Sequence, residues 1–182
     1  MSILGKIYCT LRGDYRFTDE QISENVATEI RNAGGKVGKN FSVYNAQIDM
    51  SFAFLLTIGD EVTITNASVL LHDACIHKKS GYTKTGKVTI GNNVFIGCNA
   101  IILLGVKIGN DVIVGAGAVV AKDIPDDSVV IGNLCRIIKN YSEYVQMEQE
   151  KMQSMPVINK FPHGLGEEER EQLQDADCGY VF

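Results

Sequence analysis

Few side chains in this sequence could act as acid or base near neutral pH. The 182 residues include three histidines, His72, His77 and His163. An imidazole titrates near neutrality, so a histidine can take a proton from a hydroxyl group under cellular conditions. A lone histidine is also commonly an ordinary packed or surface residue. His72 is our candidate base because it ends the aliphatic run 69–71, just before the sequence pattern changes.

Two neighbours of His72 could share in its chemistry. Asp73 could orient the imidazole, but adjacent residues of an extended strand point to opposite faces, which favours a structural role. Cys75 raises the alternative of a cysteine nucleophile activated by the histidine. Nothing else in the sequence indicates an acyl-cysteine, and we interpret Cys75 as a packed thiol.

A six-residue repeat must position these side chains. The first set of aliphatic positions is Ile90, Ile96, Ile102, Ile108, Val114 and Val120, and the second is Val94, Ala100, Val106, Val112, Ala118 and Ile124. A period of six fits neither an amphipathic helix nor an alternating strand. It fits a prism of stacked coils in which one position always points to the axis, since a single coil cannot bury its own apolar face. A β-sandwich with coincidental spacing is the weaker alternative.

An earlier register of the same period precedes this one. It runs through Ile58, Ile64, Leu70 and Ile76, with support at Val62, Ser68 and Ala74. The two registers are offset by a length that is not a multiple of six. We therefore expect an extruded loop between them, at residues 78–87.

The segments on either side of the repeat look helical or irregular. Thr18-Asp19-Glu20-Gln21 reads as a capping box, followed by an apolar stripe of Ile22, Val26 and Ile30. Ser142 could cap a second helix to about Met155, and Glu167–Gln174 is a short helix or a disordered stretch. We predict an N-terminal arm with a short helix (1–36), a β-helix domain (37–138), and a C-terminal helix and tail (139–182).

Composition excludes some classes of partner. The net charge of −5 argues against nucleic acid, because phosphate binding normally needs a basic face. Five scattered cysteines without a CxxC pair are typical of a reducing cytoplasm. No signal-peptide pattern is found, and no apolar run is long enough to span a bilayer. We expect a soluble, cytoplasmic protein with no membrane span.

The order of the repeats resembles a known family. The stretches that carry the resemblance are Ile90-Gly91-Asn92-Asn93-Val94-Phe95-Ile96-Gly97, Leu104-Gly105-Val106-Lys107-Ile108-Gly109-Asn110, Val114-Gly115-Ala116-Gly117-Ala118-Val119-Val120, Lys122-Asp123-Ile124-Pro125 and Gly132-Asn133-Leu134-Cys135-Arg136-Ile137-Ile138. They resemble the hexapeptide-repeat O-acetyltransferases, which include galactoside, maltose and surface-polysaccharide acetyltransferases. The resemblance implies a left-handed parallel β-helix with an extruded loop and flanking helices. It also implies direct transfer of acetyl from acetyl-CoA to a sugar hydroxyl, with His72 as base and no metal.

The same resemblance implies an assembly and a set of binding residues. The enzymes of this family are homotrimers with each active site in a groove between two prisms. The matched positions for acetyl-CoA are Phe95, Cys98, Ala116, Ala121 and Lys122, with Arg136 or Lys139 near the nucleotide end. Phe95 replaces a tryptophan, Cys98 a serine, Ala121 a threonine and Leu134 a proline, which puts cofactor affinity in doubt more than activity. For the acceptor, Asn45 and Tyr82 are candidates, although Asn45 could simply turn a corner.

Two other functional classes stay open at this point. A γ-class carbonic anhydrase uses the same prism, but its zinc needs three imidazoles, and the coils contain only His72 and His77. A non-catalytic β-helix that scaffolds a partner is the third possibility, and the replacements at Ala121 and Leu134 favour it. Retention of a histidine beside an extruded loop argues against it.

Overall fold

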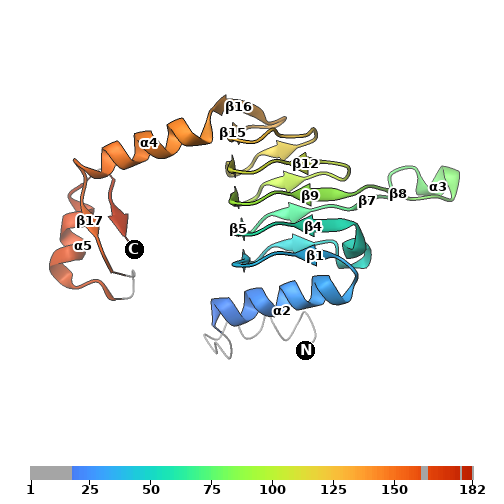
Figure 1. The fold of residues 1–182 in the computed structure, drawn as a ribbon, viewed down its shortest axis with the longest axis horizontal. Helices are drawn as coiled ribbons and strands as arrows, with labels where there is room; N and C mark the ends of the chain where they lie inside the picture. The colour runs from blue at the N-terminus through green and yellow to red at the C-terminus, as the bar shows by residue number, and fades with distance from the viewer. Residues whose placement is uncertain (1–17, 161–163, 177, 182) are drawn as a thin grey trace. The chain divides into compact units, whose positions relative to one another are not determined.

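The six-residue repeat folds into short parallel strands that stack as successive coils (Figure 1). The computed structural model describes residues 18–160, 164–176 and 178–181; residues 1–17 of the predicted arm and His163 lie outside this part. The coils are β1 (Lys36–Val37), β2 (Ser42–Tyr44) and β3 (Gln47–Ile48); β4 (Leu56–Ile58), β5 (Val62–Thr65) and β6 (Ser68–Val69); β9 (Val88–Ile90), β10 (Val94–Ile96) and β11 (Ile101–Ile102); and β12 (Lys107–Ile108), β13 (Val112–Val114) and β14 (Val119–Val120).

Each strand pairs in parallel with the equivalent strand of the next coil, which makes three sheets around one core. Their orders are β1-β4-β9-β12, β2-β5-β10-β13 and β3-β6-β11-β14. The second sheet continues through β15 (Ser128–Ile131) to an antiparallel strand, β16 (Arg136–Lys139). Both predicted sets of aliphatic positions between Ile90 and Ile124 are buried, so the repeat is confirmed as the source of the core. Burial of these side chains is the main stabilising contribution, at about 25 cal/mol per Å² of apolar surface.

Left-handed residues and a ladder of polar side chains turn one corner of every coil. Asn40, Glu61, Asn93, Asp111 and Asp127 lie there with φ between 53° and 57°. Beside them, the carboxylate or amide oxygens of Asp60, Asn92, Asn110 and Asp126 accept a backbone N–H from the preceding coil at 2.7–2.9 Å. Short polar side chains tolerate this backbone region and also satisfy the amides that the turn exposes.

The predicted earlier register is wrong after Ile64. Ile58, Val62 and Ile64 are buried, but Leu70 and Ile76 are exposed, Ala74 is exposed, and Ser68 is only half-buried. Ala67, Val69 and Leu71 face the core in their place. Ile64 pairs with Ile96 and Val69 with Ile102, so this coil needs five residues where the next needs six. The shorter corner moves every later side chain by one position.

Helix α2 (Asp19–Asn32) covers the first coil (Figure 1). The capping box is confirmed: the Thr18 hydroxyl accepts from Gln21 N at 3.3 Å, and Thr18 N donates to Gln21 Oε1 at 2.9 Å. The buried stripe is Ser23, Ala27 and Ile30; the predicted stripe is wrong at Ile22, which is exposed. Ser23 lies in the stripe because its hydroxyl accepts the Val43 N–H of β2 at 2.9 Å.

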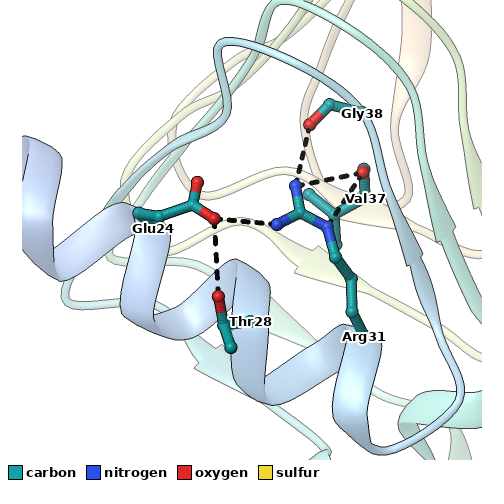
Figure 2. A network of polar contacts seen from close by, with 5 residues as sticks. All are labelled: Glu24, Thr28, Arg31, Val37 and Gly38. Carbon is teal, nitrogen blue, oxygen red and sulfur yellow. Dashed lines mark hydrogen bonds and ion pairs between the residues drawn. The ribbon is translucent and has the colours of Figure 1, made fainter.

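Hydrogen bonds from Arg31 link the end of α2 to β1 and the residue after it (Figure 2). Its guanidinium donates to the carbonyls of Val37 and Gly38 at 3.3 Å and to Glu24 at 2.9 Å, while the Thr28 hydroxyl also donates to Glu24. The planar guanidinium suits this role because it presents several donors in a fixed arrangement.

Insertions of two lengths interrupt the coils. Where no insertion occurs, paired residues of successive coils are 18 positions apart, as Thr89 and Lys107 are. The spacing rises to 21 between Lys36 and Thr57, and to 32 between Thr57 and Thr89. The first insertion holds the 3-10 helix η1 (Met50–Leu55). The second contains the predicted loop and starts earlier, with β7 (His72–Asp73), α3 (His77–Ser80) and β8 (Lys84–Thr85); it projects sideways from the coils (Figure 1).

The chain from Asn140 onward forms a separate unit. It contains α4 (Tyr141–Met152), β17 (Val157–Ile158), α5 (Glu167–Gln174) and β18 (Tyr180–Val181). Helix α4 is capped at Asn140, not Ser142, and ends before the predicted Met155. The Tyr180 hydroxyl donates to Glu148 Oε2 at 2.9 Å, and β17 pairs in parallel with β18. Over the described ranges, no helix combines the length and apolar character needed to cross a membrane.

Candidate active site

His72 begins the projecting loop, where the chain leaves the stacked coils. Leu71 immediately before it is fully buried and accepts a hydrogen bond from Gly86 N at 3.0 Å, which closes the base of the loop. His72 pairs with Thr85 across β7 and β8. Its side chain is 40% exposed, so the ring is accessible to a substrate although its backbone is held by both arms of the loop.

Asp49 orients the imidazole of His72. It follows β3 in the coil below, where its backbone N–H donates to Val69 O at 3.2 Å. Its carboxylate contacts His72 Nδ1 and is only 10% exposed. A carboxylate can only accept at this contact, so Nδ1 carries the hydrogen and Nε2 of the neutral ring is left with its lone pair. This is the form in which a histidine acts as a base.

Phe52 packs against the same ring. The ring centroids of Phe52 and His72 are 4.8 Å apart, with the planes inclined by 33°. Phe52 belongs to η1, the insertion that follows Asp49. Asp49 and the short insertion after it therefore supply the polar and the apolar contact that fix the orientation of His72.

Asp73 and Cys75 interact with each other. Asp73 Oδ1 accepts the Cys75 backbone N–H at 2.8 Å, and this hydrogen bond is the main reason that the pKa of Asp73 lies below its ordinary value. A hydrogen bond to the Asp73 carboxylate in turn raises the pKa of the Cys75 thiol. Cys75 is exposed, so its prediction as a packed thiol is wrong, but the raised pKa makes it a poor nucleophile.

His77 lies apart from this arrangement. It begins α3, and its Nδ1 contacts the Thr83 hydroxyl at 3.2 Å within the loop. Among the residues that the structure describes, no group of three or more His, Cys, Asp or Glu side chains could hold a metal ion. His72 and His77 thus have separate partners.

The predicted acetyl-CoA residues lie on the outside of the coils. Phe95 is exposed at the centre of β10, between two side chains that point to the core. Cys98 and Ala116 occupy the same corner in successive coils, and Cys98 O accepts from Gly117 N at 2.8 Å. All three side chains are therefore exposed on the outside of the coils.

The remaining predicted cofactor residues follow the last complete coil. Ala121, directly after β14, is partly exposed, and the next residue, Lys122, is exposed. Arg136 and Lys139 lie in β16, opposite Ile131 and Val129 of β15. Their basic side chains are on the strand at the edge of the second sheet.

The two predicted acceptor residues lie on different elements. Asn45 turns the corner between β2 and β3 with φ of 52°, which agrees with its alternative interpretation as a corner residue. Tyr82 follows α3 in the projecting loop, and 78% of it is exposed.

Asp49 and Phe52 are the site residues that the sequence analysis missed. Gln47–Ile48 pairs with Ser68–Val69, which places Asp49 beside the end of the strand that precedes His72. The available signal was Ile48 followed by an aspartate and a break in the repeat. It could be found only by extending the repeat into the first coil with its correct corner length.

Comparison with known proteins agrees with the repeat and the fold. The sequence profile described as bacterial transferase hexapeptide (six repeats) matches residues 87–122. Protein CapG of Staphylococcus aureus is 43% identical over 123 residues, which cover 64% of this chain and 72% of CapG. The chain spans 62% of the putative acetyltransferase YvoF of Bacillus subtilis and 54% of the galactoside O-acetyltransferase of Escherichia coli.

Solved structures give the same result. The maltose O-acetyltransferase from Clostridium difficile 630 matches with a TM-score of 0.53 and 32% identity, over 77% of this chain and 89% of that enzyme. Galactoside acetyltransferase in complex with coenzyme A matches with a TM-score of 0.52 and 29% identity, over 75% and 80%. The fold is thus a left-handed parallel β-helix of hexapeptide repeats. The chain belongs to the hexapeptide-repeat transferases, and the proteins that it resembles include maltose and galactoside acetyltransferases.

Proposed function

We propose that this protein transfers an acetyl group from acetyl-CoA to a hydroxyl of a sugar or polysaccharide precursor, with His72 as general base. The observation that carries the proposal is the His72 ring, accessible to substrate and held at Nδ1 by the Asp49 carboxylate. The names of the maltose and galactoside acetyltransferases support the sugar acceptor, and the coenzyme A complex supports the donor.

The proposed reaction needs one proton transfer in each direction. Nε2 of His72 takes the proton of the acceptor hydroxyl while its oxygen attacks the thioester carbonyl. The tetrahedral intermediate then collapses, the carbon–sulfur bond breaks, and the imidazolium returns the proton to the leaving thiolate. The products are an acetyl ester and coenzyme A. We assign the outer surface of the coils around Phe95, Cys98 and Ala116 to the binding of the pantetheine arm. Holding both reactants in the correct orientation contributes much of the rate enhancement in such reactions.

We further propose a homotrimer in the cytoplasm. Tyr44 and Phe95 on the second sheet and Leu70 directly after β6 are exposed apolar side chains, and flat prism faces suit closed packing of identical subunits. The four described cysteines, Cys75, Cys98, Cys135 and Cys178, are free thiols, which supports a reducing compartment. Light scattering after size-exclusion chromatography gives the subunit number directly.

The test of the reaction is acceptor-dependent release of coenzyme A, measured with a thiol reagent across a panel of sugars. We expect His72→Ala to lower kcat by about 10²- to 10⁴-fold with little change in KM for acetyl-CoA. His77→Ala is the matched control and should keep its activity. A near-normal kcat in His72→Ala removes His72 from the mechanism. A wild-type protein that acetylates no acceptor favours the alternative of a non-catalytic β-helix scaffold. Stoichiometric zinc in the purified protein would favour a γ-class carbonic anhydrase.

A further inference from the structure

Thr85 lies directly across from His72 at the base of the projecting loop. The two residues are partners in the antiparallel pair β7–β8, and opposite residues of such a pair place their side chains on the same face. In the next pair along, Gly86 N donates to Leu71 O at 3.0 Å. His72 and Thr85 therefore form a non-hydrogen-bonded pair, whose Cβ atoms lie roughly 4.5–5.5 Å apart. The register thus carries the Thr85 hydroxyl beside the imidazole.

The Thr85 hydroxyl is accessible to a ligand. Thr85 is exposed, and its hydroxyl makes no hydrogen bond to any other residue that the structure describes. The hydroxyl of Thr83, two positions earlier, instead contacts His77 Nδ1 at 3.2 Å. A hydroxyl that the loop does not use can form its hydrogen bonds with a substrate.

Asp49 and Thr85 flank His72 from different coils. Asp49 follows β3 in the coil before, and Thr85 lies on the strand that leads into β9 of the coil after. The Asp49 carboxylate occupies Nδ1 of the imidazole. A substrate that is bound by Thr85 can therefore meet the ring only at Nε2. This is the nitrogen that takes the proton in the proposed reaction.

The chemistry of a threonine hydroxyl indicates which part of the substrate it contacts. It both donates and accepts hydrogen bonds, as a sugar hydroxyl does. The thioester oxygen that becomes negative in the reaction can only accept, and such oxygens are usually held by fixed donors. On a sugar ring, the hydroxyl of the neighbouring carbon is the closest second polar group to the one that reacts. Thr85, adjacent to the base, is in the position to bind it.

We propose that Thr85 binds the hydroxyl next to the one that is acetylated, so that the acceptor is a vicinal diol of a sugar ring. This inference rests on the proposed acetyl transfer at His72. One hydroxyl gives its proton to Nε2 while its neighbour is hydrogen-bonded to Thr85 Oγ1. Two fixed contacts orient the ring, and they select which of its hydroxyls reacts.

The test compares sugars with their deoxy derivatives in wild type and in Thr85→Val. Methyl β-D-galactopyranoside and methyl β-D-glucopyranoside serve as acceptors, each with its monodeoxy derivatives, and NMR of the product identifies the acetylated hydroxyl. We expect loss of the neighbouring hydroxyl to lower kcat/KM of the wild type by about 3- to 10-fold. Thr85→Val should lower kcat/KM for the complete sugar by a similar factor. It should be almost insensitive to the missing hydroxyl, because the contact is already lost.

Two further variants serve as controls. Thr85→Ser keeps a hydroxyl at this position and should keep the preference for the complete sugar. Thr28→Val makes the same replacement on the exposed side of α2 and should leave kcat/KM for every acceptor unchanged. Valine suits a β-strand, so Thr85→Val should retain the β7–β8 pair, and thermal unfolding checks that its stability is unchanged.

Several results overturn the proposal while the acetyl transfer itself stands. If Thr85→Val lowers kcat equally for the complete and the deoxy sugar, the hydroxyl acts on the reacting centre and not on the neighbouring hydroxyl. Activity within twofold of wild type places Thr85 outside the site. A change in KM for acetyl-CoA alone assigns its hydroxyl to the donor. If the wild type acetylates none of these glycosides, the proposed function fails and this inference fails with it.

Discussion

The carboxylate of Asp49 contacts Nδ1 of His72, although 23 residues separate them in the sequence. The two lie in neighbouring coils, and the Phe52 ring packs on the imidazole beside this contact. A largely buried carboxylate on Nδ1 fixes both the ring orientation and the tautomer, so that Nε2 is the atom that meets a substrate.

Replacement of Asp49 tests this positioning role. Asp49→Asn keeps the shape but can offer an N–H to Nδ1, which favours the tautomer that has no lone pair at Nε2. We expect kcat to fall by about 10- to 100-fold with KM for acetyl-CoA nearly unchanged, and Asp49→Glu to restore part of the loss. Steady-state kinetics measures both constants. Activity within twofold of wild type in Asp49→Asn contradicts the role.

Cys75 offers a test of the Asp73 contact. The hydrogen bond to the Asp73 carboxylate raises the pKa of this thiol, so little thiolate is present at neutral pH. Asp73→Asn removes the negative charge but can still accept the Cys75 backbone N–H. We expect iodoacetamide to modify Cys75 faster in this variant, followed at pH 8 by peptide mass spectrometry. Equal rates in both proteins argue against the hydrogen bond.

The buried Ser23 hydroxyl should stabilise the packing of α2 on the first coil. Ser23→Ala leaves the Val43 N–H of β2 without its acceptor in a buried place. We expect the free energy of unfolding to fall by about 1–3 kcal/mol, measured by urea denaturation. Thr28→Ala, on the exposed side of the same helix, is the control and should change stability much less. Equal effects of the two changes count against a specific bond.

Glu61 occupies a corner position that suits a shorter side chain. Its φ is 57°, and asparagine or aspartate stands at the equivalent corners at Asn40, Asn93, Asp111 and Asp127. Glu61→Asn should raise the free energy of unfolding by about 0.5–1 kcal/mol, because asparagine tolerates the left-handed region better. The new amide oxygen can still accept from Asn40, as Asp111 does from Asn93. Thermal or urea denaturation measures the change, and a less stable variant contradicts it.

Acid should loosen the C-terminal unit. Hydrogen bonds from Lys151 and then Tyr180 lower the pKa of Glu148. A lowered pKa in the folded state adds stability above the ordinary glutamate pKa of about 4.3, and this stability is lost as the pH falls through the lower folded value. Amide protection factors in α4 and β18, which correct for the intrinsic exchange rate at each pH, should fall below about pH 4 in wild type. Glu148→Gln should lack this step, and an identical acid response in both proteins is the contrary result.

Much of the fold follows from local sequence pattern. The period of six between Ile90 and Ile124 determines which side chains enclose the core, and it was confirmed because those coils share one corner length. The capping box at Thr18 was also readable, since its partners are three residues apart. His72 was found as a candidate from its place before the break in the repeat.

Tertiary structure alone decided the rest. The five-residue step from Ile64 to Val69 puts Leu71 in the core and Leu70 outside, because a corner one residue shorter shifts by one position which of the following residues face the core. The same short corner and the insertion at η1 determine which residue of the first coil contacts the His72 ring. Sequence period reports which way a side chain points within one coil. Contacts between coils depend on the summed lengths of the corners and insertions, which residue types alone do not specify.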